Sequence, residues 1–171
     1  NLNYIVSSPI AVLWGYKNHD TAFYDDVTLK TRFEVAENYR YNYDVSIIGI
    51  PHPVLKWNST YHKTYDEIRG LEEIIAFNPS SIIMGINASD PIEYIEDTIN
   101  ILKATLGVKP DLIVIGNYAY DNETYIDNTL LFLPMTKKDM IERCKYVHKN
   151  TKIPCCILDR SADAILNCIL Q

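Results

Sequence analysis

Short apolar segments recur along the chain, and most are followed by a longer stretch with apolar residues at helical spacing. The apolar segments are residues 9–15 (PIAVLWG), 45–50 (VSIIGI), 81–86 (SIIMGI), 111–116 (DLIVIG) and 153–158 (IPCCIL), with a possible sixth at 129–133 (TLLFL). Continuous hydrophobicity is typical of strands that are buried on both faces of a parallel sheet. The alternation predicts a doubly wound, mostly parallel α/β sheet of five or six strands with helices on both faces, Rossmann-like or flavodoxin-like.

Helices are predicted between these strands, over residues 21–38, 65–77, 91–106, 137–148 and 162–170. Asp90 is expected to cap the third helix, with Pro91 at its first position, and Gly107 lies where a terminal glycine is expected. Thr136 and Ser161 are expected to cap the last two helices. The acidic, tyrosine-rich segment 117–128 (NYAYDNETYIDN) is expected to be a long loop. It could be a lid, a partner surface or a solvated insertion.

Length and charge narrow the class of protein. The 171 residues suit a single domain, 1–171. A net charge of −6 argues against a nucleic-acid binder and against binding to anionic membranes. No apolar run approaches the roughly 20 residues of a membrane helix. The four cysteines, Cys144, Cys155, Cys156 and Cys168, form no C-x-x-C pair, so we expect buried free thiols in a reducing, cytoplasmic compartment.

The predicted fold also says where a functional site would lie. In open α/β sheets, ligands bind outside the carboxyl ends of the strands. Polar residues that follow the predicted strands are therefore candidates for the site, and the main ones are Tyr16, His19, Asp20, His52, Asn87, Ser89, Asn117, Asp159 and Arg160. The opposite edge of the sheet is expected to hold plain connectors, such as Asn78-Pro79 and Gly107-Val108.

Several motifs with a known chemistry are missing from the sequence. There is no G-x-G-x-x-G after residues 9–15, no G-x-x-x-x-G-K-[ST] and no G-x-S-x-G. This argues against nicotinamide, flavin-dinucleotide and P-loop proteins and against α/β-hydrolases. No spacing typical of a metal site is present, and the sequence leaves the cofactor unknown.

Two hypotheses about function follow. The first is a binding or sensory domain for a small polar molecule, held by the uncharged and charged hydrogen-bonding groups of Tyr16, Asn87, Ser89, Asn117, Asp159 and Arg160. Residues 152–163 (KIPCCILDRSAD) resemble, at the level of fold, an edge strand of sugar-binding regulator lobes.

The second hypothesis is a small-molecule enzyme: a transferase, hydrolase or lyase. His19 would act as a general base with Asp20 or another carboxylate beside it, and His52 would join it in the site. His19 and Asp20 could instead bind a metal together with His52 and Asp159. Under either hypothesis a homodimer or a larger assembly stays open.

Overall fold

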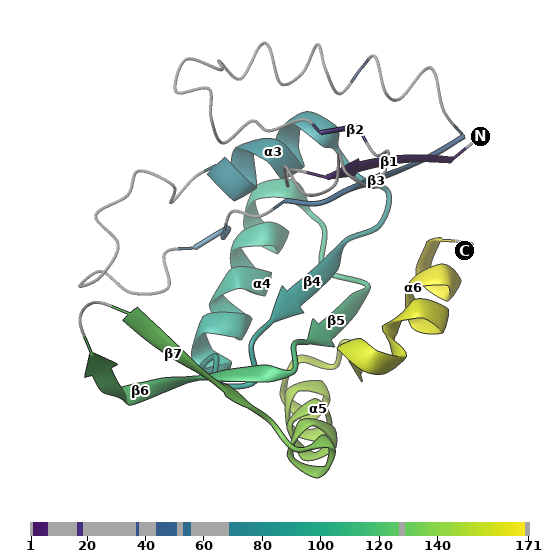
Figure 1. Ribbon diagram of the computed structural model, residues 1–171. Helices are drawn as coiled ribbons and strands as arrows, with labels where there is room; N and C mark the ends of the chain where they lie inside the picture. Colours follow the sequence, from purple (N-terminus) through teal and green to yellow (C-terminus); the bar gives the residue numbers. More distant parts are fainter. Residues whose placement is uncertain are drawn as a thin grey trace. The chain divides into compact units, whose positions relative to one another are not determined.

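The computed structural model describes residues 2–6, 17–18, 37, 44–50, 53–55, 69–126 and 129–169 (Figure 1). The chain divides into two compact units, Asn1–Pro79 and Ser80–Gln171, which are described separately below. The strand predicted over 9–15 and all but one residue of the helix predicted over 21–38 lie outside the described residues. Whether the chain is one domain stays a prediction.

The first unit contains a three-stranded parallel sheet with the strand order β2-β1-β3. The strands are β1 (Leu2–Val6), β2 (Lys17–Asn18) and β3 (Val45–Ile48). The pattern of apolar residues predicted β3 but not β1, because polar residues interrupt the sequence LNYIV. Helix α3 (Arg69–Phe77) ends where predicted: Asn78 adopts a left-handed φ of 44°.

The second unit contains another parallel sheet, with the order β4-β5-β8. Its strands are β4 (Ile83–Ile86), β5 (Leu112–Ile115) and β8 (Cys155–Ile157), and all three lie within predicted segments. Ile86 is in register with Ile115, which is in register with Ile157. The central strand β5 is buried along its whole length, as its continuous hydrophobicity predicts.

Three helices accompany this sheet: α4 (Ile92–Leu106), α5 (Lys137–Thr151) and α6 (Ser161–Ile169). Gly107 ends α4 with a φ of 69°, as predicted for a C-terminal glycine. Thr136 caps α5 as predicted, since its hydroxyl accepts a hydrogen bond from the Asp139 N–H.

Two of the predicted caps are wrong. Pro91, not Asp90, is the N-cap of α4, because the Asp90 carboxylate turns back to accept the N–H of Asn87 instead. Ser161 is the first residue of α6 rather than its cap, since a short 3-10 helix, η2 (Leu158–Arg160), precedes it. The Ser161 hydroxyl donates to the Leu158 carbonyl.

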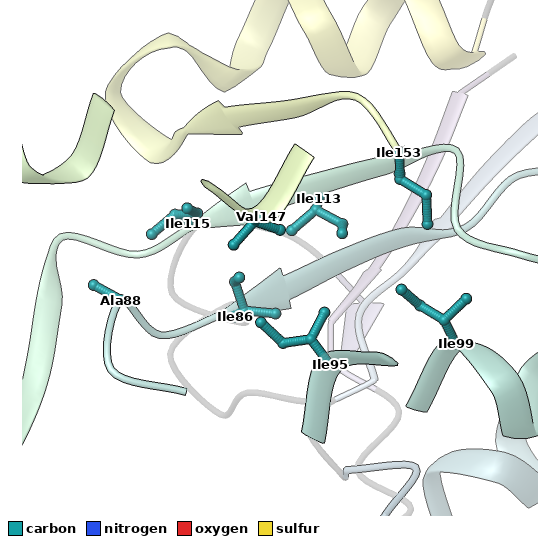
Figure 2. Close-up of a cluster of buried hydrophobic side chains, with 8 residues drawn as sticks. All are labelled: Ile86, Ala88, Ile95, Ile99, Ile113, Ile115, Val147 and Ile153. Carbon is teal, nitrogen blue, oxygen red and sulfur yellow. The ribbon is translucent and has the colours of Figure 1, made fainter. Parts of the chain in front are cut away.

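Helices α4 and α5 pack against the β4-β5-β8 sheet. Ile113 and Ile115 project from one face of β5 and pack with α4, through Ile95, and with α5, through Val147 (Figure 2). The core cluster also contains Ile86, Ala88, Ile99 and Ile153. Helix α6 packs on β5 and β8 (Figure 1).

The prediction of a loop over residues 117–128 is wrong for residues 118–126, while Asp127 and Asn128 lie outside the described residues. Strand β6 (Tyr118–Ile126) pairs in antiparallel fashion with β7 (Thr129–Pro134), and the ladder shifts register between Asp121 and Ile126. Tyrosine, threonine and isoleucine favour strands, and pairing with the apolar segment TLLFLP outweighs the acidic residues that suggested a loop.

The described residues therefore form a mixed α/β structure with four helices and three-stranded parallel sheets. Among these helices, none combines the length and the apolar character needed to cross a membrane.

Candidate functional site

The carboxyl ends of β4, β5 and β8 lie next to one another, because the three strands are parallel neighbours. A hydrogen bond of 2.9 Å from the Gly116 N–H to the Ile86 carbonyl joins the ends of β5 and β4. A Cβ atom at Gly116 would lie 3.5 Å from the Ile86 oxygen and 4.0 Å from Asn87 Oδ1. The segments that follow these strands are thus held close together, which is the geometry that the sequence predicted for a binding site.

At the end of β4, Asn87 and Asp90 form a closed turn. The Asn87 N–H donates to Asp90 Oδ2 at 2.8 Å, and the Asp90 N–H donates to the Asn87 carbonyl at 3.2 Å. The Asn87 side chain also hydrogen-bonds to the Asp90 carboxylate. Burial raises the pKa of Asp90, while the hydrogen bonds from Asn87 and the charge of Arg143 act in the opposite direction. Asn87 is therefore occupied in shaping this turn.

Arg143, on α5, supports the same turn from a distant part of the sequence. Its Nη2 donates to the Asp90 carbonyl, and its guanidinium lies over the Tyr146 ring, 5.3 Å from the ring centroid. Its Nε is buried and has no hydrogen-bond partner. The sequence contained no local signal for this contact, because Arg143 is separated from Asp90 by 53 positions and sits in an ordinary amphipathic helix.

Asn117 and Asp159 connect the ends of β5 and β8. Asn117 Nδ2 donates to Asp159 Oδ1 at 2.8 Å. A carboxylate only accepts, so this bond fixes the amide with its nitrogen toward Asp159 and its oxygen away from it. That oxygen, Asn117 Oδ1, is buried and has no hydrogen-bond partner. Asp159 itself is exposed.

The other residues predicted for the site are only partly placed. Tyr16, His19, Asp20 and His52 lie outside the described residues. Ser89 follows Asn87 in the turn after β4 and is half-buried. Arg160 is described in its backbone alone, as the last residue of η2. The structure thus brings together Asn117 and Asp159 and places Asn87 beside Gly116, whereas the proposed catalytic residues are not described.

The donor and acceptor groups at this edge indicate what it could bind. The side chains that reach it from β5 and β8 offer an amide oxygen and a carboxylate, which both accept hydrogen bonds. Within the described ranges, no group of three histidine, cysteine or acidic side chains is arranged to hold a metal ion. The arrangement suits a ligand that donates hydrogen bonds from hydroxyl or N–H groups.

Comparison with models of protein families, with curated proteins and with solved structures gave no match for this chain. The assignment of a function therefore depends on the geometry of the site.

Proposed function

We propose that this protein is a binding domain for a small polar molecule, taken up at the carboxyl edge of the β4-β5-β8 sheet. The observation that carries the proposal is the pair Asn117–Asp159, in which a buried amide oxygen lacks a partner beside an exposed carboxylate. Polar atoms that are buried without a partner are rare in folded proteins, and each one calls for an explanation. A ligand that donates to Asn117 Oδ1 would supply the missing partner.

Energetics favour a ligand with hydrogen-bond donors. Leaving a buried acceptor without a partner costs about 1–3 kcal/mol, and a donor from the ligand would recover part of that cost. A phosphate or carboxylate would instead meet Asp159 and an amide oxygen, which repel it. Sugars, polyols and amines are therefore the chemical classes that the site suits best, in agreement with the net charge of −6.

The proposal includes the finer features of the fold. The packing of α4, α5 and α6 against the parallel β4-β5-β8 sheet supports a doubly wound, Rossmann-like or flavodoxin-like arrangement with helices on both faces, in which the carboxyl edge is the usual ligand site. We also propose a cytoplasmic location, which the four free cysteines support, and a homodimer or larger assembly as an open alternative to a monomer.

The enzyme hypothesis rests on residues that the structure does not describe. His19, Asp20 and His52 all lie outside the described ranges, so no observation favours a transferase, hydrolase or lyase over a binding domain. Catalysis with these residues stays a prediction.

A thermal-shift screen tests the binding proposal. Sugars and polyols, amino acids and amines, and nucleotides would each be added in excess to the whole chain. A ligand at about 100 times its Kd stabilises by about 2.7 kcal/mol, which for a chain of this size raises the Tm by roughly 5–10 °C. We expect such a shift with a hydroxyl- or amine-bearing compound and a much smaller one in Asn117→Ala.

The matched control is Asp111→Asn, at the opposite edge of the same sheet. It should change the Tm of the free protein but leave the ligand-induced shift intact. A flat response to all three classes of compound, or an equal loss of the shift in both variants, would argue against a site at Asn117 and Asp159.

A further inference from the structure

A second feature of this unit is a pocket between α5 and β8, formed by residues other than those of the carboxyl-edge site. Its volume is about 300 Å³, and its lining is mostly apolar. Three of the four cysteines line it: Cys144 from α5, with Cys155 and Cys156 from β8. Three thiols therefore border one pocket. Small molecules that react with thiols could enter this pocket and reach them.

Cys144 and Cys155 face each other across this pocket. Both pack against the same core cluster, although Cys144 comes from a helix and Cys155 from a strand. Each of the two thiols perturbs the pKa of the other. Cys156 also borders the pocket, but it is the next residue along β8, and it is Cys155 that packs with Cys144 against the core cluster. Cys144 and Cys155 are therefore the pair of thiols that this packing brings together.

We propose that Cys144 and Cys155 are a site of oxidative modification, and that they form a disulfide with each other when a small organic disulfide enters the pocket. The proposal does not depend on the function proposed above. All four cysteines are free thiols in this structure, which is the reduced state of the pair.

The reaction proceeds by two successive exchanges. The Cys144 thiolate attacks one sulfur of the small disulfide, whose S–S bond breaks, and one small thiolate leaves and takes up a proton. Cys155 then loses its proton and attacks the Cys144 sulfur, which releases the second small thiol. Two protein thiols are oxidised to one disulfide, and the small disulfide is reduced to two thiols.

The depth at which each thiol lies assigns these two roles. Burial raises the pKa of both thiols, and it raises that of Cys155 further than that of Cys144. Cys144 is thus the better attacking group and Cys155 the resolving one, and the reaction should accelerate with pH.

Oxidised glutathione is the probe for a direct test on the whole native chain. After incubation at about pH 7, 8 and 9, intact mass and peptide mapping would identify the product. We expect the loss of two hydrogens with a link between Cys144 and Cys155, restored by a reducing agent. The rate should rise by up to tenfold per pH unit, because only the thiolate attacks and burial keeps its fraction small.

Single cysteine-to-serine variants separate the roles. In Cys155→Ser, the reaction should stop at a glutathione adduct on Cys144. Cys144→Ser should form neither the disulfide nor a comparable adduct on Cys155. Cys156→Ser and Cys168→Ser should behave like the wild type. Circular dichroism and thermal unfolding would show which variants fold. Oxidation of the wild type in urea provides the unfolded reference.

Several results would overturn the proposal. The first is a disulfide in the native protein that involves Cys156 or Cys168. The second is the same mixture of disulfides in the native and urea samples. The third is that the thiols of the native protein stay unmodified while the unfolded chain is oxidised. Because the wild-type product decides these cases, a variant that fails to fold leaves the proposal testable.

Discussion

The two edges of the β4-β5-β8 sheet each hold an exposed aspartate, but the two residues are bonded very differently. At the amino edge, Asp111 Oδ2 accepts from the Ser81 hydroxyl and from the Ile82 N–H, both at 2.9 Å. The Asp111 N–H also donates to the Ile82 carbonyl at 2.8 Å. At the carboxyl edge, Asp159 Oδ1 accepts a hydrogen bond from Asn117 Nδ2, and the side-chain oxygen of Asn117 has no partner.

The difference shows that exposure and charge alone do not identify a ligand site. Asp111 joins the starts of two neighbouring strands, so its role in the fold accounts for its hydrogen bonds. The Asn117–Asp159 pair is incomplete, and an incomplete pair of hydrogen-bonding groups is what a ligand can complete. We therefore expect substitutions at the amino edge to affect stability, and substitutions at the carboxyl edge to affect binding.

The largest expected effect on stability comes from β5, the central strand, which runs from one edge to the other. Ile113, in β5, is fully buried in the core cluster. Ile113→Ala should lower the free energy of unfolding by about 3–4 kcal/mol, since it removes buried methyl groups and leaves a cavity. Urea denaturation measures this value. A loss below about 1 kcal/mol would mean that β5 is not the centre of the core, and the comparison of its two edges would lose its basis.

The next effect separates the two aspartates. Asp111→Ala should cost about 1–2 kcal/mol, because Ser81 and the Ile82 N–H lose a charged acceptor at an exposed site. Asp159→Ala should cost no more than about 0.5 kcal/mol, as is usual for surface substitutions. Both values come from the same denaturation experiment. Equal losses in the free energy of unfolding for the two variants would contradict the difference between the two edges.

A smaller effect concerns the buried carboxylate of the carboxyl edge. Burial raises the pKa of Asp90, so folding favours its protonated form and the stability that it contributes is lost as pH rises through the acid range. Asp90→Asn keeps an oxygen that can accept the Asn87 N–H and removes the charge. Relative to wild type, this variant should become more stable as pH increases from about 3 to 7. Denaturation at both pH values checks this, and a trend of the opposite sign would show that Arg143 outweighs burial.

A small effect on stability is also expected at Asn117. Asn117→Ala removes one hydrogen bond to an exposed carboxylate, but it also removes a buried oxygen that has no partner. These two contributions oppose each other, so the free energy of unfolding should change by less than about 1 kcal/mol. Ser81→Ala, at the amino edge, is the matched variant. A cost at Asn117 well above the cost at Ser81 would indicate a structural role for Asn117.

Much of the second unit could be predicted from the sequence, for reasons that the structure makes clear. Strands of a parallel sheet are rich in apolar residues, and the segments that became β4, β5 and β8 are too, although only β5 is buried along its whole length. The hairpin β6–β7 was missed because its stability comes from pairing between two segments, and β6 by itself contains acidic residues. Local patterns carry no information about such a partner.

The place of the candidate residues could be predicted from the sequence, but their hydrogen bonding could not. Parallel topology places Asn87, Asn117 and Asp159 at one edge, where the rule for strand ends predicts a ligand site. Which of their oxygens is left without a partner depends on side-chain geometry, and the contact between Arg143 and Asp90 joins residues that are distant in sequence. Neither can be derived from residue types and spacing.

The most direct test of a ligand site at the carboxyl edge is an NMR titration of the ¹⁵N-labelled chain with the sugars, polyols and amines of the screen. We predict that one of these compounds shifts the backbone amides of Asn117 and Asp159 and the side-chain amide of Asn117, and leaves Ser81 and Asp111 unchanged. Shifts centred on Ser81 and Asp111, or no saturable shift with any of these compounds, would contradict the account.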